Sequence, residues 1–370
     1  MNGNRGRAGQ AVPVASGAAA HAVAHPSLAL VKYWGKRSGG VNLPATSSLG
    51  VTVGALTTRT TCSLAAEDSL TIDGVPTDPG KISAFFDELR RYLRTTTGHA
   101  DGLGAGGDHA GGQAAADHHG GSQPAAGRFG GGASTLRFAV ESHNSFPTAA
   151  GLASSASGFA ALTMAAVAAA GGNTNDSAAL SALARHGSGS AARSIFGGFT
   201  AWPAGAPAAE EIFPQEWWPE LRIVVLPLSA ASKPVSSRDA MNLTRDTSPY
   251  YPAWVADASA LFTRAREAVS RRDLEALGTV MRLSYLRMFA TMLGAEPPVE
   301  YWIPASVAVQ RRLAELRAAG VGAWETMDAG PQVKVLTSED EADRVVRECA
   351  PWCSGEPVIS PVGGPATVET

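Results

Sequence analysis

Cysteine and basic charge are both scarce in this 370-residue chain, and it contains no long apolar run. Three cysteines, Cys62, Cys349 and Cys353, make an odd number without neighbouring histidines, which favours free thiols in a reducing compartment over a zinc site. A net charge of −3 gives no basic excess for nucleic-acid or membrane-surface binding, so an anionic ligand must meet a local cluster. The Ala-rich run 159–170 is shorter than the roughly 20 residues of a membrane helix, and we expect a buried core helix.

A hydrophobic content of 45% with 17% charged residues is typical of a soluble globular protein with a sizeable core. The length fits two domains and the composition excludes disorder throughout. Residues 1–20 carry Arg5 and Arg7 and no acid, which is typical of a transit peptide, but they lack the apolar core of a signal peptide. We expect a flexible tail at 1–20 and a cytoplasmic protein.

Residues 95–134 consist mostly of Gly, Ala and His, with almost nothing to bury. Such a segment does not recover the entropy lost on ordering, so we predict a disordered surface insertion. Four of the eight histidines lie here, which makes metal binding conceivable, but their irregular spacing favours an adventitious site over an evolved one.

Strand and helix patterns mix through both halves of the chain without a strict βαβ repeat, which favours an α+β fold. An Asp73-Gly74 pair is typical of a hairpin turn, and Pro79 precedes a helical pattern that runs to Leu93. The other predicted helices cover 176–187, 253–270, 274–293 and 305–319. The predicted strands cover 48–65, 134–142, 221–229, the neighbourhood of Asp328, 333–336 and 358–359.

The stretch SFPTAAGLASSASGFAAL, residues 145–162, passes from a Gly- and Ser-rich turn directly into an apolar helix. The N–H groups and dipole of such a helix entrance attract phosphate, with Gly151 permitting close approach and Ser154 and Ser155 supplying hydroxyls. A helix cap with small packing residues is the alternative. The stretch is not a Walker A loop, because the Gly-x-x-x-x-Gly-Lys-Ser/Thr pattern is absent.

Two further clusters combine cations with hydroxyl groups. In LALVKYWGKR, residues 28–37, a half-buried strand would place Lys32, Trp34 and Lys36 on one face. In GSGSAARSIFGGF, residues 187–199, Ser190 and Arg193 would share a face if a helix begins there. Solvated lysines beside a core aromatic, and a capping serine with a surface arginine, explain each cluster equally well on its own.

Taken together, these clusters resemble the diphosphomevalonate decarboxylases of the GHMP kinase superfamily, in their bacterial form. The resemblance runs from about His25 to the C-terminus and leaves out only the tail and the insertion. Six motifs occur in the family's order: KYWGKR, NLPATSSL, FPTAAGLASSAS, GSGSAARSIFGGF, VSSRDAMNLTRDTS and TMDAGP.

The resemblance implies a two-domain GHMP kinase fold with the active site in the cleft between the domains. An N-terminal ATP-binding domain of the ribosomal protein S5 domain 2-like type would cover 21–205, and a ferredoxin-like α/β-plait domain would cover 206–370. It also implies a cytoplasmic homodimer that uses ATP and Mg²⁺ to convert (R)-5-diphosphomevalonate into isopentenyl diphosphate, ADP, phosphate and CO2, in the mevalonate pathway of isoprenoid biosynthesis. In the family's mechanism the tertiary C3 hydroxyl is phosphorylated, phosphate departs, and loss of CO2 delivers the electrons.

The matching motifs imply roles for individual residues. Asp328 would orient or deprotonate the C3 hydroxyl, Arg193 would bind the substrate carboxylate and phosphate, and Lys32 would be an active-site lysine. The residues that would bind the substrate are Tyr33, Lys36, Ser188, Gly189, Ser190, Arg193 and Arg238. The residues that would bind ATP are Gly151, Ser154, Ser155, Lys233 and Ser237, with Ser155 as a ligand of the Mg²⁺ that ATP carries and Lys233 on a loop that closes over the nucleotide.

Four positions depart from the family's usual residues. Ser27 and Gln332 each replace an Asn, and Phe289 and Met292 replace His and Asn, so we expect two polar groups near the site to become apolar. These changes leave alternatives open: a decarboxylase of 5-phosphomevalonate, a GHMP small-molecule kinase without decarboxylation, and a noncatalytic nucleotide-binding or interaction protein.

Overall fold

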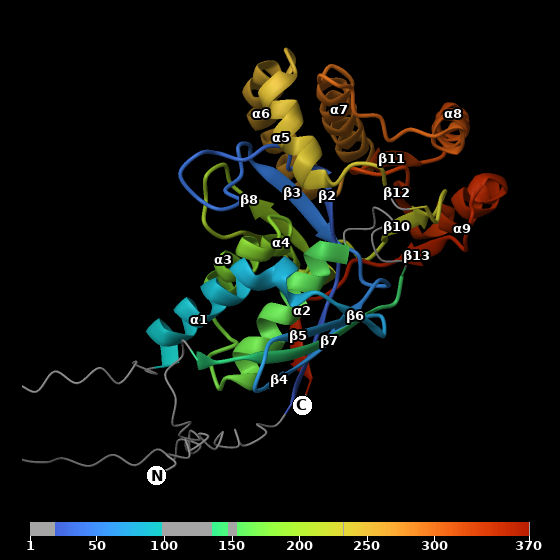
Figure 1. Cartoon of the computed structure of the whole chain (residues 1–370). Coiled ribbons are helices and arrows are strands. Elements are labelled where there is room, and N and C mark those ends of the chain that lie inside the picture. Colours follow the sequence, from blue (N-terminus) through green and yellow to red (C-terminus); the bar gives the residue numbers. More distant parts are fainter. Residues whose placement is uncertain (1–18, 98–134, 147–153, 232, 370) are drawn as a thin grey trace, which may run out of the picture.

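The computed structural model describes residues 19–97, 135–146, 154–231 and 233–369, which form three sheets and the helices around them (Figure 1). The first sheet has the order β14-β1-β4-β7-β5-β6, the second β2-β3-β8-β9, and the third β11-β12-β10-β13. The strands of the first sheet are β1 Ala20–Ala24, β4 Thr58–Leu64, β5 Ser69–Ile72, β6 Val75–Thr77, β7 Phe138–Asn144 and β14 Thr367–Glu369. Those of the second are β2 Ser27–Val31, β3 Ser48–Thr52, β8 Phe199–Trp202 and β9 Glu210–Phe213. Those of the third are β10 Leu221–Leu226, β11 Trp324–Met327, β12 Val333–Ser338 and β13 Val358–Ser360.

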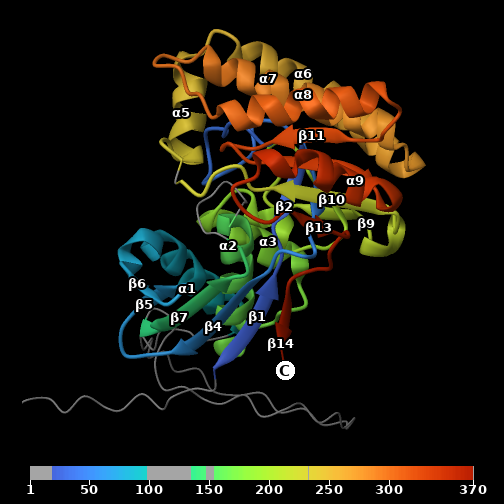
Figure 2. The ribbon, with the colours of Figure 1, turned by 90° about the vertical axis from the view of Figure 1, so that its right-hand side faces the viewer.

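The helices fall into two groups that lie at opposite ends of the molecule (Figures 1 and 2). The first group covers the β1 sheet and comprises α1 Ser83–Thr97, α2 Ser154–Ala169, α3 Ser177–Gly187 and α4 Ala191–Ser194. The second comprises α5 Ser237–Thr247, α6 Tyr251–Arg271, α7 Leu274–Leu293, α8 Pro304–Ala318 and α9 Glu339–Cys349. This mixture of sheets and helices without a strict βαβ repeat confirms the α+β prediction.

Helix α2 is the buried Ala-rich helix that the sequence predicts. Ten of its residues, from Ala156 to Val167, are buried, and it packs on β1 and β4. Small side chains let a helix approach a sheet closely, so the packing of α2 on the sheet fixes the position of its first residues, Ser154 and Ser155. The predicted Gly151 lies outside the described residues.

A separate apolar cluster joins the two halves of the chain. Leu28, Leu30 and Val51 of the second sheet share this cluster with Leu261 of α6 and Leu277 of α7. Helices of the C-terminal half therefore pack directly on N-terminal strands, and burial of this apolar surface fixes the relative position of the halves. Among the described helices, none is long and apolar enough to span a membrane.

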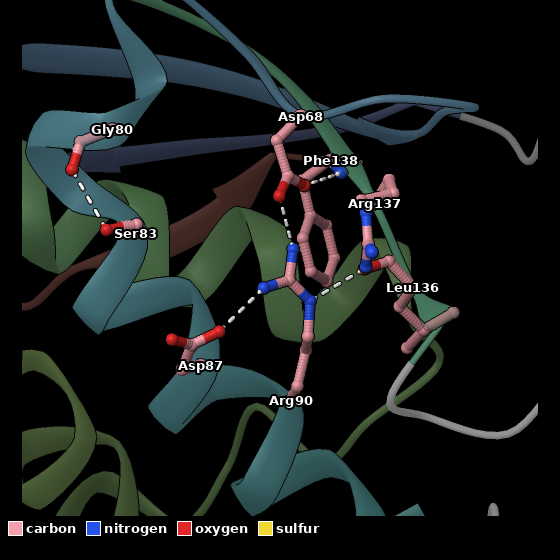
Figure 3. Close-up of polar contacts among 8 residues, drawn as sticks. All are labelled: Asp68, Gly80, Ser83, Asp87, Arg90, Leu136, Arg137 and Phe138. Atoms are coloured by element: carbon pink, nitrogen blue, oxygen red, sulfur yellow. Dashed lines mark hydrogen bonds and ion pairs between the residues drawn. The ribbon is translucent and has the colours of Figure 1, made fainter.

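Helix α1 is attached to the strand that follows the undescribed segment 98–134. The Arg90 guanidinium donates to Asp68, to Asp87 and to the carbonyl oxygen of Leu136, and the other oxygen of Asp68 accepts from the amide of Phe138 (Figure 3). This buried arginine connects α1, before segment 98–134, with residues after that segment. The two flanks are therefore held to each other by contacts that do not involve the segment.

Several local predictions can be compared with the structure. Asp73 and Gly74 have positive φ values of 50° and 78°, and they form the predicted hairpin turn between β5 and β6. The free state of the three cysteines is confirmed. The expected strand through Lys32, Trp34 and Lys36 is wrong, because β2 ends at Val31 and the amide of Lys32 donates to the Ser284 hydroxyl of α7.

The predicted segment boundaries differ from the structure at their edges. Ala20 belongs to β1, and α1 continues to Thr97, where the hydroxyls of Thr95 and Thr96 donate to the carbonyl oxygen of Tyr92. Apart from Ala19, the rest of these two predicted segments, residues 1–18 and 98–134, lies outside the described residues. Strands β9 and β14, both within the predicted C-terminal domain 206–370, pair with strands of the N-terminal half. The division into domains itself stays a prediction.

Candidate active site

A cavity of about 870 Å³ lies where β2, α2, α4, α5 and the turn after β11 meet. This volume accommodates two small anionic ligands side by side. Every predicted site residue that the structure describes lines this cavity: Lys32, Tyr33, Lys36, Ser154, Ser155, Ser188, Gly189, Ser190, Arg193, Lys233, Ser237, Arg238 and Asp328. The structure thus brings the predicted residues together in one cavity, although they come from segments almost 300 positions apart.

Asp328 occupies the turn between β11 and β12 and has a lysine on each carboxylate oxygen. The Nζ of Lys32 lies 2.7 Å from Oδ1, and the Nζ of Lys334 lies 3.2 Å from Oδ2. Burial alone would raise the pKa of this carboxyl, but the two ammonium groups outweigh it and hold the pKa well below its usual range. Because 27% of the Asp328 side chain is exposed, ligands in the cavity reach the carboxylate.

Lys32, the partner of Asp328, is buried, with only 2% of its side chain exposed. Its Nζ also donates to the carbonyl oxygen of Ala29 at 2.8 Å. Burial lowers the pKa of Lys32 to about 8, although the contact with Asp328 acts in the opposite direction. An ammonium group with a pKa this close to neutrality gives up or takes back a proton readily.

Lys334 is the residue that the sequence reasoning missed. It lies on β12 with 5% of its side chain exposed, between the apolar residues Val333 and Val335. Unpaired lysines are almost never buried, so a lysine inside the run VKVL was a signal that a carboxylate lies nearby.

Arg193 on α4 presents a buried guanidinium to the cavity, with 2% of the residue exposed. Nη1 donates to the Ser48 hydroxyl at 2.7 Å, and Nε donates to the Ser27 hydroxyl at 3.3 Å. Burial lowers the pKa of Arg193 to about 10, although the negative charge of Asp328 acts in the opposite direction. Within the described chain no carboxylate forms an ion pair with this guanidinium, so its charge is available for an anionic ligand.

A line of hydroxyl groups connects α2 with the segment before α4. The Ser155 and Ser188 oxygens lie 3.3 Å apart, and so do the Ser188 and Ser190 oxygens. Gly189 lies so close to Tyr33 that a Cβ there would be 2.5 Å from the phenol oxygen. These hydroxyls lie beside the first turn of α2, and the N-terminus of a helix favours an anion.

Two further cations line the cavity near Tyr33. They are Lys36 and Arg238, and the pKa of Lys36 is lowered by burial and by the charge of Arg238. Burial raises the pKa of Tyr33, so its hydroxyl stays protonated. The repulsion between Lys36 and the neighbouring charge of Arg238 is relieved by an anion of high charge density, such as a diphosphate.

Lys233 lies in the loop between β10 and α5. Its Nζ donates to the Ser237 hydroxyl at 2.7 Å and approaches the carbonyl oxygen of Ala329 at 3.4 Å. Burial lowers its pKa, with Asp328 acting against the burial. The loop therefore places a third lysine near Asp328.

Two of the departures lie elsewhere than expected. Phe289 stacks on Trp302 at a centroid distance of 5.2 Å, and Met292 is fully buried in the same core, so neither lines the cavity. The expectation of two apolar groups at the site is wrong for these residues. Met288, which directly precedes Phe289 on α7, lines the cavity instead.

The charges of the cavity favour a ligand that carries several phosphates and a carboxylate. The described residues contain no group of three or more His, Cys, Asp and Glu that would hold a metal ion by themselves. A divalent cation at this site must therefore be held largely by ligand oxygens, and the Ser155 hydroxyl is a suitable protein ligand for it.

Two family models match the chain. The diphosphomevalonate decarboxylase-like N-terminal domain matches residues 24–212, and the mevalonate 5-diphosphate decarboxylase C-terminal domain matches residues 223–356. The diphosphomevalonate decarboxylase of Aspergillus fumigatus is 35% identical over 86% of this chain and 76% of its own length. That of Bos taurus is 32% identical over 85% of this chain and 75% of its own length.

Solved structures agree with these relatives. A mevalonate diphosphate decarboxylase from Enterococcus faecalis superposes with a TM-score of 0.78 at 33% identity, over 96% of this chain and 99% of its own. That from Staphylococcus aureus gives a TM-score of 0.78 at 30% identity, over 95% and 98%. A structure described as MDDEF in complex with MVAPP, AMPPCP and magnesium gives 0.79 at 33% identity, over 96% and 99%. The predicted two-domain GHMP kinase fold is thereby confirmed, and the chain belongs to the diphosphomevalonate decarboxylase family.

Proposed function

We propose that the chain catalyses the ATP-dependent decarboxylation of (R)-5-diphosphomevalonate to isopentenyl diphosphate, ADP, phosphate and CO2, in the mevalonate pathway of isoprenoid biosynthesis. The observation that carries this proposal is the carboxylate of Asp328, held between Lys32 and Lys334 in the same cavity as the unpaired Arg193 guanidinium. The names of the family models and relatives support the same activity.

The reaction needs a good leaving group, because the carboxylate of the substrate is not β to a carbonyl that could accept electrons. The C3 oxygen forms a bond to the transferred phosphoryl group, and ADP leaves. The C3–O bond then breaks with loss of phosphate, the C1–C2 bond breaks with loss of CO2, and its electron pair forms the C2=C3 double bond. Asp328 orients the C3 hydroxyl and accepts its proton as the phosphoryl bond forms. Lys32 stabilises the negative charge of the transferred phosphoryl group.

The substrate has an anion at each end, and the cavity has a cationic site for each. Arg193 binds the carboxylate and later the departing phosphate, assisted by Ser188, Gly189 and Ser190. The diphosphate binds where Tyr33, Lys36 and Arg238 line the cavity.

ATP fits at the start of α2, where Ser154 and Ser155 line the cavity beside the N–H groups of the first helical turn. Lys233 approaches from the loop before α5, which we propose closes over the nucleotide, and Ser237 approaches from the first turn of α5. When bound with ATP, Mg²⁺ neutralises phosphate charge, and the Ser155 hydroxyl is the protein ligand that we propose for it. A complex with AMPPCP and magnesium in a similar protein supports these two ligands.

Two related functions are kept as alternatives. A decarboxylase of 5-phosphomevalonate would bind one phosphate fewer, and the cationic site formed by Lys36 and Arg238 favours the diphosphate. A GHMP kinase would release the phosphorylated acid, and the unpaired Arg193 beside Asp328 favours decarboxylation, because it binds both the carboxylate that is lost as CO2 and the departing phosphate.

The test supplies ATP and Mg²⁺ with mevalonate, 5-phosphomevalonate or 5-diphosphomevalonate and measures ADP and CO2 together. We expect equal amounts of both products, at the highest kcat/KM with 5-diphosphomevalonate. ADP without CO2 would contradict the decarboxylase, and a preference for 5-phosphomevalonate would support the alternative. The Asp328→Asn variant should lose turnover by several orders of magnitude while its affinity for an ATP analogue stays unchanged.

A homodimer, a cytoplasmic location and a domain division at residues 205/206 are further proposals that rest on the family resemblance. Light scattering of the purified protein measures the first, and a molecular mass of one chain, 38.0 kDa, would contradict it.

A further inference from the structure

The side chain of Gln332 is a buried amide, 1% exposed, that binds main-chain groups of a distant segment. Its Oε1 accepts from the amides of Leu228 and Ser229 at 2.5 and 3.3 Å. Its Nε2 donates to the carbonyl oxygen of Ser229 at 2.6 Å. Three hydrogen bonds from one carboxamide to two consecutive residues imitate the pairing of a neighbouring strand, and they fix this segment in orientation as well as in place.

The segment that Gln332 binds is the stem of the loop that carries Lys233. Strand β10 ends at Leu226, and residues 227–229 form the stem of the loop. The loop then continues to the N-cap of α5 at Ser236. The stem is buried or half-buried, whereas Ala230 and Ala231 beyond it are exposed. The loop thus leaves the body of the protein directly after the residues that Gln332 holds.

The other end of this connection is the turn that carries Asp328. The carbonyl oxygen of Pro331 accepts from the Ser306 hydroxyl of α8 at 2.8 Å, and two lysines hold the Asp328 carboxylate. Lys233 contacts the same turn at only one point, the carbonyl oxygen of Ala329 at 3.4 Å. The turn is therefore rigidly held, and Gln332 provides the stronger of the two contacts between it and the loop.

We propose that Gln332 is a positioning residue: it fixes the stem of the Lys233 loop to the Asp328 turn, so that the lysine reaches the nucleotide phosphates from a defined position. This inference rests on the proposed function only in naming the nucleotide as the ligand of Lys233. The Asn usual at this position is one methylene shorter and does not reach both the amide of Leu228 and the carbonyl oxygen of Ser229.

The variants are Gln332→Met, which keeps the volume but removes all three hydrogen bonds, and the milder Gln332→Asn. Ser354→Ala is the matched control, because the Ser354 hydroxyl donates to the stem at the carbonyl oxygen of Pro227, 3.2 Å away, without contacting the Asp328 turn. Hydrogen exchange followed by mass spectrometry reports on the stem without any substrate. We expect Gln332→Met and, less strongly, Gln332→Asn to accelerate exchange in residues 227–236 and to leave β12 at the wild-type rate.

A second measurement asks whether Gln332 acts through Lys233. Affinity for a non-hydrolysable ATP analogue, with 5-diphosphomevalonate present, is compared in wild type, Gln332→Met, Lys233→Met and the double variant. We expect a loss of roughly tenfold from Gln332→Met alone and less than twofold when Lys233 is already absent. Ser354→Ala should leave the affinity unchanged.

Additive losses in the double variant, or equal acceleration of exchange in the stem and in β12, would overturn the proposal, because either result describes a residue that merely stabilises the fold. Neither readout requires turnover. A wild-type protein that binds the analogue but releases no CO2 would contradict the proposed function and leave the test of Gln332 intact.

Discussion

The ion pairs of Asp328 predict a specific loss of stability in the Asp328→Asn variant. At 2.7 and 3.2 Å, the two pairs correspond to Coulomb energies of about 6 and 5 kcal/mol at an effective dielectric constant of 20. Much of this energy offsets the burial of Lys32 and Lys334. Without the carboxylate Lys32 escapes the remaining penalty by releasing its proton, which costs roughly 5 kcal/mol at pH 7 relative to a free lysine. Breaking a buried pair typically costs about 3–5 kcal/mol, and we expect about 4 kcal/mol at pH 7.

The loss should depend on pH in a defined direction. In Asp328→Asn the pKa of Lys32 falls further below its value in the unfolded chain, so the unfolded state binds more protons between pH 7 and about 10.4. The free energy of unfolding of the variant therefore rises with pH, and the difference from wild type shrinks. Lys32 of the wild type, with its pKa lowered to about 8, contributes a smaller rise of the same sign.

Thermal unfolding at pH 7 and pH 9.5 measures this effect. For a chain of this length, about 4 kcal/mol corresponds to a decrease in Tm of about 5 °C. Replacing Lys32 by Met in the same variant should recover part of the decrease, because the buried ammonium group that lost its carboxylate is then absent. A variant as stable as wild type at pH 7, or a decrease that is the same at both pH values, would refute the electrostatic account of the site.

Three further predictions concern other parts of the molecule. Because burial lowers the pKa of Lys32 to about 8, kcat/KM should fall as the pH rises through about 8, and a profile that is flat to pH 10 would contradict the need for its charge. In Gly50→Ala the new Cβ would lie 2.8 Å from the Nε of Arg193, so the guanidinium must move. We expect KM for the acid substrate to rise at least about tenfold and the free energy of unfolding to decrease by about 1–3 kcal/mol. Gly158→Ala, whose Cβ meets nothing within 4 Å, is the control that should leave KM unchanged. Glu325→Gln removes a fully buried charge that pairs with two arginines, so urea unfolding should show a loss of about 3–5 kcal/mol while KM stays constant; a shifted KM would mean that this network reaches the site.

Local signals in the sequence predicted local structure well. The α7 helix covers the predicted residues 274–293 because Asp273 accepts from the amide of Ala276 as an N-cap, and α3 begins in the same way at Asp176. The hairpin at Asp73-Gly74 follows from the two left-handed residues that its turn requires. In each case the cause lies within a few residues of its effect.

Distant contacts account for what the sequence did not predict. The amide of Lys32 donates to a hydroxyl 252 residues away on α7 and not to a neighbouring strand, and no pattern within LALVKYWGKR contains that information. Lys334 was overlooked for the related reason that its partner, Asp328, lies across a turn of undetermined shape. The motifs identified which residues meet in the cavity, but not which atoms they contact.

Strand β14 has a consequence for how the chain is made and divided. It pairs with β1 across His21–Glu369, Ala22–Val368 and Val23–Thr367, so a strand near residue 20 receives one of its two neighbours only after almost the whole chain has left the ribosome. Until then β1 presents an open edge to other molecules. A fragment that ends near residue 212 would keep that edge permanently open. The N-terminal half can therefore be excised as a well-behaved unit only if the distant residues 361–369 are returned to it, for example as a covalently joined peptide.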